Sequence, residues 1–198
     1  PYYVPGAGTG VVFCADNITS LSGVVADNIL TSDNPPQVKH RSEFTIAADV
    51  NNGKNITITS DIKYKSAPDP NKPLNDPVNL TPGTLGLIGR NVIISNTAPK
   101  DLEINAVVLA GSSTTTDGSF YVQNYNTKKP TGVLKLVGGI IQKARGPVGT
   151  FNSSTGQIVT GYAKNYWYDP RLANNPPPYF PTTGLYDRIS WKRTTNND

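Results

Sequence analysis

The chain has 198 residues, a length that suits one domain, or a domain with a terminal cap, and allows a sizeable core without disulfides. Hydrophobic residues make up 36% and charged residues 16%, while the 18 Gly and 17 Pro exceed the usual content of these residues. This composition favours many short strands joined by turns over long helices. The net charge of +4 is small and spread along the chain, which argues against a dedicated binder of duplex DNA.

Short apolar runs, separated by Asn, Asp, Gly and Pro, recur along the chain, as is typical of strands joined by turns. The run at 55–62 alternates strictly between apolar and polar residues, and the run at 102–110 is the longest. No segment combines a helix cap with a 3.6-residue period, so the pattern predicts strands only. In chain order they are expected at 10–14, 21–26, 44–48, 55–62, 85–89, 91–94, 102–110, 120–122, 133–137 and 139–141.

The sequence lacks any run of roughly 20 apolar residues, which a membrane-spanning helix needs. The single cysteine, Cys14, lies in an apolar run at 11–15, so we expect a buried, inert thiol. A catalytic Cys–His pair with His40, the one histidine, is disfavoured. Low cysteine content, no methionine and abundant Asn, Thr and Gly resemble the composition of a surface protein, and we expect an extracellular or cell-surface location.

Two architectures accommodate many short strands: a β-sandwich or barrel, and a parallel β-solenoid. In two places, 58–62 and 136–140, neighbouring runs are separated by only one to three residues without a good hairpin turn, and similar runs recur every ~25–45 residues. We therefore predict an all-β fold, a single-stranded parallel β-helix (β-solenoid) over residues 1–161, with a sandwich as the alternative. Its interior is predicted to hold Val12, Ile46, Ile58, Ile88, Ile93, Val107, Leu136 and Ile140.

Two segments interrupt the strand pattern. Residues 66–84 contain five prolines and predict a long loop outside the coil. Residues 162–198 are rich in aromatics and proline, and the stretch at 174–181 suits neither strand nor helix. We expect 162–198 to be an irregular C-terminal cap, of the kind that solenoids use to protect their terminal strands.

Several segments of the second half occur in an order that resembles an uncharacterised family of exported bacterial β-helix domains linked to type IV pili. The resemblance covers about residues 85–181 and, more loosely, 10–64. It rests on the segments 85–92, 98–106, 138–149, 166–172 and 176–181.

This family resemblance implies two kinds of activity. The chain is similar to tapirins, pilus-locus surface proteins whose β-helix cores bind cellulose, and to minor pilins whose β-solenoid head is implicated in DNA uptake. It departs from both because it lacks the hydrophobic N-terminal helix of a pilin, so the mode of attachment does not follow. The resemblance supplies no catalytic residues.

The C-terminal aromatic residues are the most informative feature. Eight of the chain's aromatic residues (2 Trp, 10 Tyr and 5 Phe in total) gather there: Tyr162, Tyr166, Trp167, Tyr168, Tyr179, Phe180, Tyr186 and Trp191. Flat aromatic faces stack on sugar rings or on bases. The alternative is that the aromatics and prolines pack together to hold an irregular cap. We predict an exposed ligand-binding platform made of Tyr166, Trp167, Tyr168 and Tyr179.

Acidic residues are too sparse to suggest an enzyme. The chain has two glutamates, Glu43 and Glu103, and the tightest acidic pair is Asp101 with Glu103, which a solvated strand edge explains equally well. No cluster of three carboxylates suggests a calcium-dependent lyase, and Cys or His metal motifs are missing. We therefore predict no catalytic residues, no cofactor and no metal.

The basic residues near the aromatics have ordinary structural explanations. The sequence Asp169–Pro170–Arg171 predicts a local ion pair or turn. Arg145, which precedes Gly146 and Pro147, is expected to anchor a loop.

Three functions of different classes remain open. A polysaccharide-binding adhesion module predicts exposed coplanar aromatics, and a DNA-capturing pilin head predicts a basic stripe beside them. A self-assembling filament subunit predicts exposed apolar strand edges. The adhesion module is preferred. The expected partners are therefore a polysaccharide or other extracellular polymer, with DNA, pilus subunits or further copies of the chain as alternatives.

Overall fold

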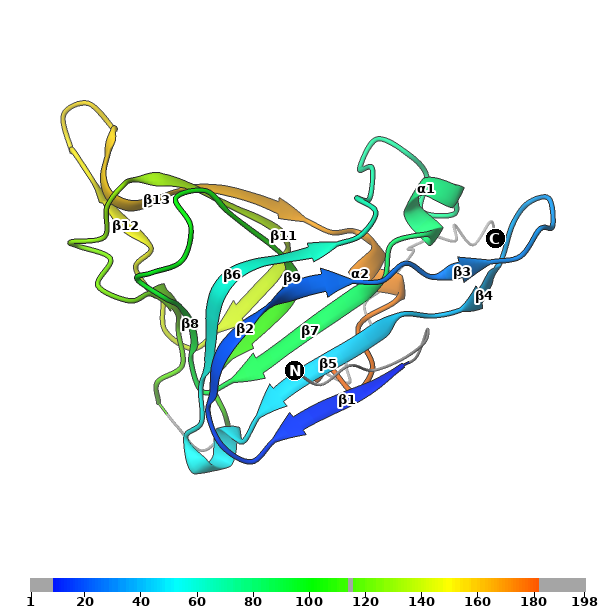
Figure 1. The fold of residues 1–198 in the computed structure, drawn as a ribbon, viewed down its shortest axis with the longest axis horizontal. Coiled ribbons are helices and arrows are strands. Elements are labelled where there is room, and N and C mark those ends of the chain that lie inside the picture. The colour runs from blue at the N-terminus through cyan, green and yellow to red at the C-terminus, as the bar shows by residue number, and fades with distance from the viewer. Residues whose placement is uncertain (1–8, 114–115, 182–198) are drawn as a thin grey trace, which may run out of the picture.

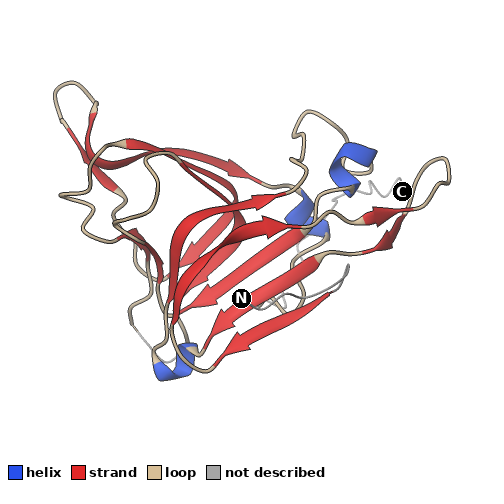
Figure 2. Cartoon of the chain, in the orientation of Figure 1, coloured by secondary structure: helices blue, strands red, loops and turns tan. Residues whose placement is uncertain are grey.

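The structure, a computed structural model, describes residues 9–113 and 116–181. Strands make up 48% and helices 6% of it, which confirms the predicted all-β class (Figure 2). The helices are short: η1 (Val50–Asn52), α1 (Pro77–Leu80) and α2 (Arg171–Asn174). Within these described residues, no helix has the length and apolar character needed to cross a bilayer.

Eleven strands form one large mixed sheet, in which most neighbours run parallel. The first row follows the order β1-β5-β7-β9-β11-β13, and all its pairs are parallel (Figure 1). These strands are β1 (Thr9–Cys14), β5 (Glu43–Ala48), β7 (Thr84–Gly89), β9 (Leu102–Ala110), β11 (Gly132–Gln142) and β13 (Ile158–Tyr168). Because neighbours in the row are not consecutive in the chain, each connection crosses over rather than forming a hairpin.

A second parallel row contains β2 (Ile18–Val25), β6 (Ile56–Tyr64), β8 (Val92–Ile94) and β10 (Phe120–Val122). The strand β6 joins the two rows, because it pairs with β8 through its first residues and with β9 at Ile62. Among the described strands, β12 (Gly149–Phe151) pairs antiparallel with β13, and β3 (Ile29–Leu30) pairs antiparallel with β4 (Val38–His40).

The hydrophobic core follows from the two-residue period of the strands. In β6, Ile56, Ile58 and Ile62 are buried while the side chains between them are partly exposed. Parallel pairing then places apolar side chains of neighbouring strands next to one another, as in the series Ile62–Ile104–Leu136 across β6, β9 and β11. Each such buried side chain contributes about 1.5–3 kcal/mol, so the aligned series stabilise the stacking of the strands.

The predicted interior positions are correct in part. Ile58 and Leu136 are buried in the core, and Ile46 and Ile140 are half-buried against it. Val107 is buried but lies outside the core cluster, because its neighbours Ala106 and Val108 face the core instead. The prediction was wrong for the remaining three, Val12, Ile88 and Ile93.

Ile88 and Ile93 are only half-buried, because the strands present their neighbours Leu87 and Ile94 to the core instead. Val12 is 43% exposed, because β1 lies at the end of its row. The same position explains Cys14, the last residue of β1, which is half-buried rather than fully buried as predicted.

The proline-rich loop is ordered by one buried amide. The side-chain nitrogen of Asn79 donates to the carbonyls of Asp69, Lys72 and Pro73, and its oxygen accepts from the Asp69 N–H. The loop contains α1, and Thr84, at the end of the predicted segment, already belongs to β7. This internal bonding gives the loop a fixed shape over the neighbouring sheet.

The predicted boundary at residue 162 was wrong, because 162–168 is the second half of β13 and pairs in register with β11. Irregular structure begins after it, and the segment 175–181 runs back across β5 and β7 as a strap. Thr45 donates to the Pro178 carbonyl, and the Phe180 ring lies against Gly86. The rest of the predicted cap, 182–198, lies outside the described residues, as do Tyr186 and Trp191.

Candidate functional site

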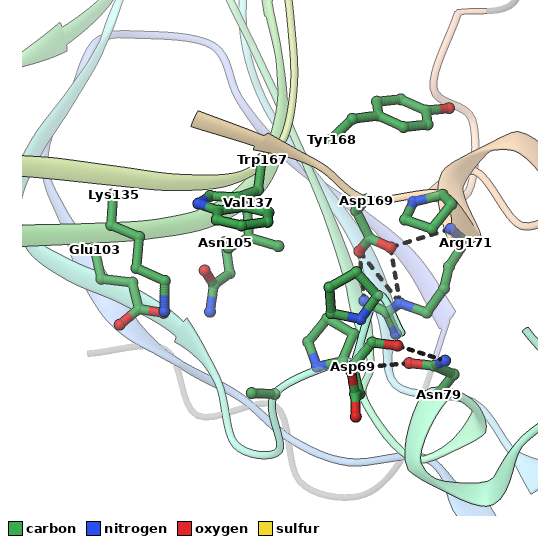
Figure 3. A pocket seen from close by; sticks show the side chains of 14 residues that line it. Asp69, Asn79, Glu103, Asn105, Lys135, Val137, Trp167, Tyr168, Asp169 and Arg171 are labelled. Carbon is green, nitrogen blue, oxygen red and sulfur yellow. Dashed lines mark hydrogen bonds and ion pairs between the residues drawn. The ribbon is translucent and has the colours of Figure 1, made fainter. Parts of the chain in front are cut away.

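The two sides of β13 hold different aromatic residues. Tyr166 is in register with Leu136, which is buried in the core, whereas Trp167 is in register with Val137 and, one strand further, Asn105. Successive strand residues point to opposite faces, so Trp167 lies on the outer face of the sheet and Tyr166 on its core side. Figure 3 likewise shows Trp167 and Tyr168 on opposite sides of the strand.

The four predicted binding residues therefore do not form one platform, although each is exposed. The exposed fractions are 38% for Tyr166, 54% for Trp167, 64% for Tyr168 and 84% for Tyr179. Tyr179 belongs to the strap and has a left-handed backbone, with φ at 57°. Trp167 and Tyr168 both border one cavity, although their rings lie on opposite sides of the strand, and Tyr166 borders another cavity. That these residues bind a ligand stays a prediction.

The cavity beside Trp167 has a volume of about 230 Å³ (Figure 3). Its floor is the outer face of β9, β11 and β13, and its walls are the proline-rich loop and the turn that leads into α2. The floor carries Glu103, Asn105, Lys135, Val137 and Trp167.

The charged part of the floor is internally neutralised. Glu103 forms an ion pair with Lys135 at 3.0 Å and lies 3.9 Å from Lys63, which is 2.8 Å from Asp61. Burial opposes ionisation of Asp61, but the Lys63 ammonium and the Glu103 N–H outweigh it and lower the pKa of that carboxyl. Carboxylates and ammonium groups thus lie next to one another on β6, β9 and β11, and Glu103 has a lysine on each side.

Asn105 is the unusual polar group of the cavity. It is only 3% exposed, and its side-chain oxygen has no hydrogen-bond partner among the described residues. Leaving a buried acceptor unsatisfied costs about 1–3 kcal/mol, so such groups are rare in folded proteins. A ligand that donates a hydroxyl or N–H here would remove this cost.

A buried ion pair fixes the wall that follows Trp167. Arg171 donates to Asp169 at 2.6 and 3.0 Å, which confirms the predicted local pair, and also to the carbonyl of Pro82 at 2.7 Å. The guanidinium lies 5.1 Å from the centre of the Tyr64 ring, a favourable cation–π contact. The Trp167 indole nitrogen donates to Asn165 at 2.6 Å, which orients the ring at the cavity edge.

Glu103 was predicted only as part of an acidic pair, and Asn105 and Lys135 were not among the predicted site residues. The structure separates the pair's roles, because Asp101 accepts the N–H of Val133 while Glu103 binds lysines. Polar residues at alternate positions of an apolar strand were the available indication of an outer face with its own chemistry. Across the described part of the chain, no three His, Cys, Asp or Glu residues are grouped to hold a metal ion.

Comparisons with protein-family models, with curated proteins and with solved structures found no match to the chain.

Proposed function

We propose that the chain is a non-catalytic extracellular or cell-surface adhesion module that binds polysaccharide in the cavity beside Trp167. One observation carries the proposal: an exposed indole borders a cavity whose floor holds the unsatisfied Asn105 oxygen. A sugar ring offers both complements, an apolar C–H face for the indole and hydroxyl donors for the amide oxygen.

Polysaccharide binding is expected to be weak at a single site and strong when many copies of the chain bind one polymer. Aromatic stacking contributes roughly 1–3 kcal/mol per ring in the nucleic-acid case, and a similar scale is assumed for sugars. A long polymer repeats the same unit, so many copies of the chain on one surface would hold it through multivalent contact.

The proposal of a β-solenoid is supported by how single strands change partners along their length. β6 pairs first with β8 and then with β9, and β9 pairs with β6 at Ile104 and with β7 from Val107 onward. Strands that pass from one row to another while keeping parallel partners fit a coil with several faces. An experimental structure in which the two rows belong to separate sheets packed as a sandwich would contradict this.

The non-catalytic character is supported by the position of Glu103. Its carboxylate is bound by Lys135 and lies near Lys63, so it is poorly placed to act as a free base or nucleophile. Incubation with cellulose, xylan or pectin is expected to release no reducing sugar or unsaturated product. Turnover that disappears in Glu103→Gln would contradict the proposal and identify an active site.

The binding test is retention on insoluble cellulose and xylan, measured for the unmodified chain and for Trp167→Ala. We expect Trp167→Ala to weaken binding about tenfold, which corresponds to about 1.4 kcal/mol. The matched control is Phe13→Ala, because Phe13 is an aromatic residue of β1 that is 62% exposed and does not line the cavity beside Trp167. Equal loss in both variants would show that general surface hydrophobicity, not the cavity, retains the protein.

The salt dependence of binding distinguishes a polysaccharide ligand from DNA. Stacking and hydroxyl contacts change little with ionic strength, whereas phosphate contacts release counterions and weaken steeply as salt rises. Strong retention on DNA at low salt, with none on polysaccharide, would favour a DNA-capturing pilin head. Growth of fibres without binding to either polymer would favour a structural subunit.

A further inference from the structure

The core side of β13 departs from the pattern of the strands before it. Leu102, Leu134 and Lys164 occupy the same register position on β9, β11 and β13. The two leucines are buried in the core, and the lysine follows them where a third apolar residue would be expected. The last strand of the row thus brings a cation to the end of the apolar core.

Two cavities open around this lysine, with volumes of about 400 and 600 Å³. Both are lined by Arg145, Gly146, Val148 and Lys164, so they share one wall. The first is completed by Phe120, Ile140, Gln142 and Tyr166, and the second by residues of β12, β13 and their connection. The surface is therefore apolar and aromatic apart from the two cations and one amide.

The two cations lack a counter-charge. No carboxylate lines either cavity in the described part of the chain, and neither Arg145 nor Lys164 forms an ion pair with any described residue. Both side chains are exposed, yet partial desolvation and then the nearby Arg145 charge lower the pKa of Lys164, which places the two like charges close to each other. The Lys164 ammonium lies 5.9 Å from the centre of the Tyr166 ring, which orients it at the cavity.

We propose that Arg145 and Lys164 bind the carboxylate of an acidic sugar, so that the chain recognises a uronate-containing polysaccharide at this second site. A carboxylate matches the planar guanidinium and supplies the missing counter-charge. Tyr166, Ile140 and Val148 offer the apolar contacts that a sugar ring uses. Two exposed cations beside an apolar surface fit one carboxylate on a ring better than the repeated phosphates of a nucleic acid, which call for a basic stripe.

This inference extends the proposed function, and its failure can be told apart from failure of the Trp167 site. The probes are a galacturonate tetramer, the neutral cellotetraose and a single-stranded oligonucleotide, each titrated calorimetrically into the whole chain at low and at high salt. The test variant is Arg145→Gln/Lys164→Gln. The control is Lys39→Gln/Lys100→Gln, which removes the same charge from exposed positions that line neither cavity.

The galacturonate tetramer is expected to bind the unmodified chain, and its affinity for the test variant should be at least tenfold lower. Trp167→Ala should lower the affinity for this tetramer much less. The control variant should bind as the unmodified chain does, and Lys164→Arg should retain most of the affinity, which separates loss of charge from loss of fold. Binding should also weaken as salt rises. The affinity for cellotetraose should not change when Arg145 and Lys164 are substituted.

Three results would overturn the assignment. The first is no galacturonate binding at millimolar concentration. The second is an equal loss in the test and control variants, which would indicate only general charge attraction. The third is an oligonucleotide that binds more tightly than the tetramer and is weakened by the same two substitutions, which would identify a nucleic-acid phosphate site.

Discussion

Removing the Asp169 carboxylate should destabilise the fold strongly, because its ion pair with Arg171 is buried. The side chains of Asp169 and Arg171 are 0% and 7% exposed. Asp169→Asn keeps the size of the side chain but removes the negative charge that faces the guanidinium, whose remaining partners are neutral oxygens, among them the Pro82 carbonyl at 2.7 Å. Breaking one partner of a buried pair typically costs 3–5 kcal/mol, so we expect about 3 kcal/mol for this conservative change.

A second Arg–Asp pair provides the control. Arg90 and Asp117 are 2.7 Å apart, nearly the same as the 2.6 Å between Arg171 and Asp169, yet their side chains are 37% and 51% exposed. Exposed pairs contribute about 0–1 kcal/mol, so Asp117→Asn should cost less than 1 kcal/mol in urea denaturation.

Double-mutant cycles with Arg171→Met and Arg90→Met isolate the pairwise coupling. The buried pair should couple by more than 2 kcal/mol, and the double variant Asp169→Asn/Arg171→Met should recover much of the loss, since two apolar or neutral groups need no counter-charge. Equal coupling at the two pairs would refute the argument that burial, rather than contact distance, determines the cost.

Further predictions concern the strands. Cys14 is half-buried on the terminal strand β1, so a soluble thiol reagent should label the native protein, though more slowly than the protein in urea. Gly138→Ala should cost more than 3 kcal/mol in urea denaturation, because φ is 155° and a Cβ would overlap a backbone carbonyl of β9, whereas Gly139→Ala, with its nearest neighbour at 3.7 Å, should be tolerated. Burial raises the pKa of Tyr162 to about 12, so stability present below pH 10 should be lost as pH rises toward 12, and Tyr162→Phe should flatten that decline in urea denaturation at pH 9 and 11.

Hydrophobic alternation predicted most strands but not always which residues face the core. In the run 55–62 the apolar residues occupy alternate positions on one side only, so the side of β6 that faces the core follows from the sequence. In 85–89 and 91–94, consecutive apolar residues leave the phase open, and the structure places Leu87 and Ile94 inside rather than Ile88 and Ile93. A one-residue shift exchanges the two faces of a strand, so local sequence could not decide between them.

The candidate site was predicted less well, for a related reason. Trp167 was identified correctly as an exposed aromatic, but a segment taken as irregular proved to be a strand, and strand alternation separates Trp167 from Tyr166. The floor residues Asn105 and Lys135 come from β9 and β11, and only the parallel register aligns them with β13. That register is a long-range property, which single-sequence patterns do not contain.

The end of the row bears on whether the chain assembles into filaments. Adding a parallel strand from another copy against the free part of β13 would place new core residues over Lys164, where Leu102 and Leu134 precede it in register. Such stacking would bury an uncompensated charge, and proteins use inward-pointing charges on edge strands to prevent edge-to-edge pairing. The antiparallel β12 already pairs with the first residues of β13 and occupies that part of the edge. The charge that is proposed to recruit an acidic sugar therefore also opposes end-to-end growth at β13, which favours a terminal binding surface over a filament contact on this side of the molecule.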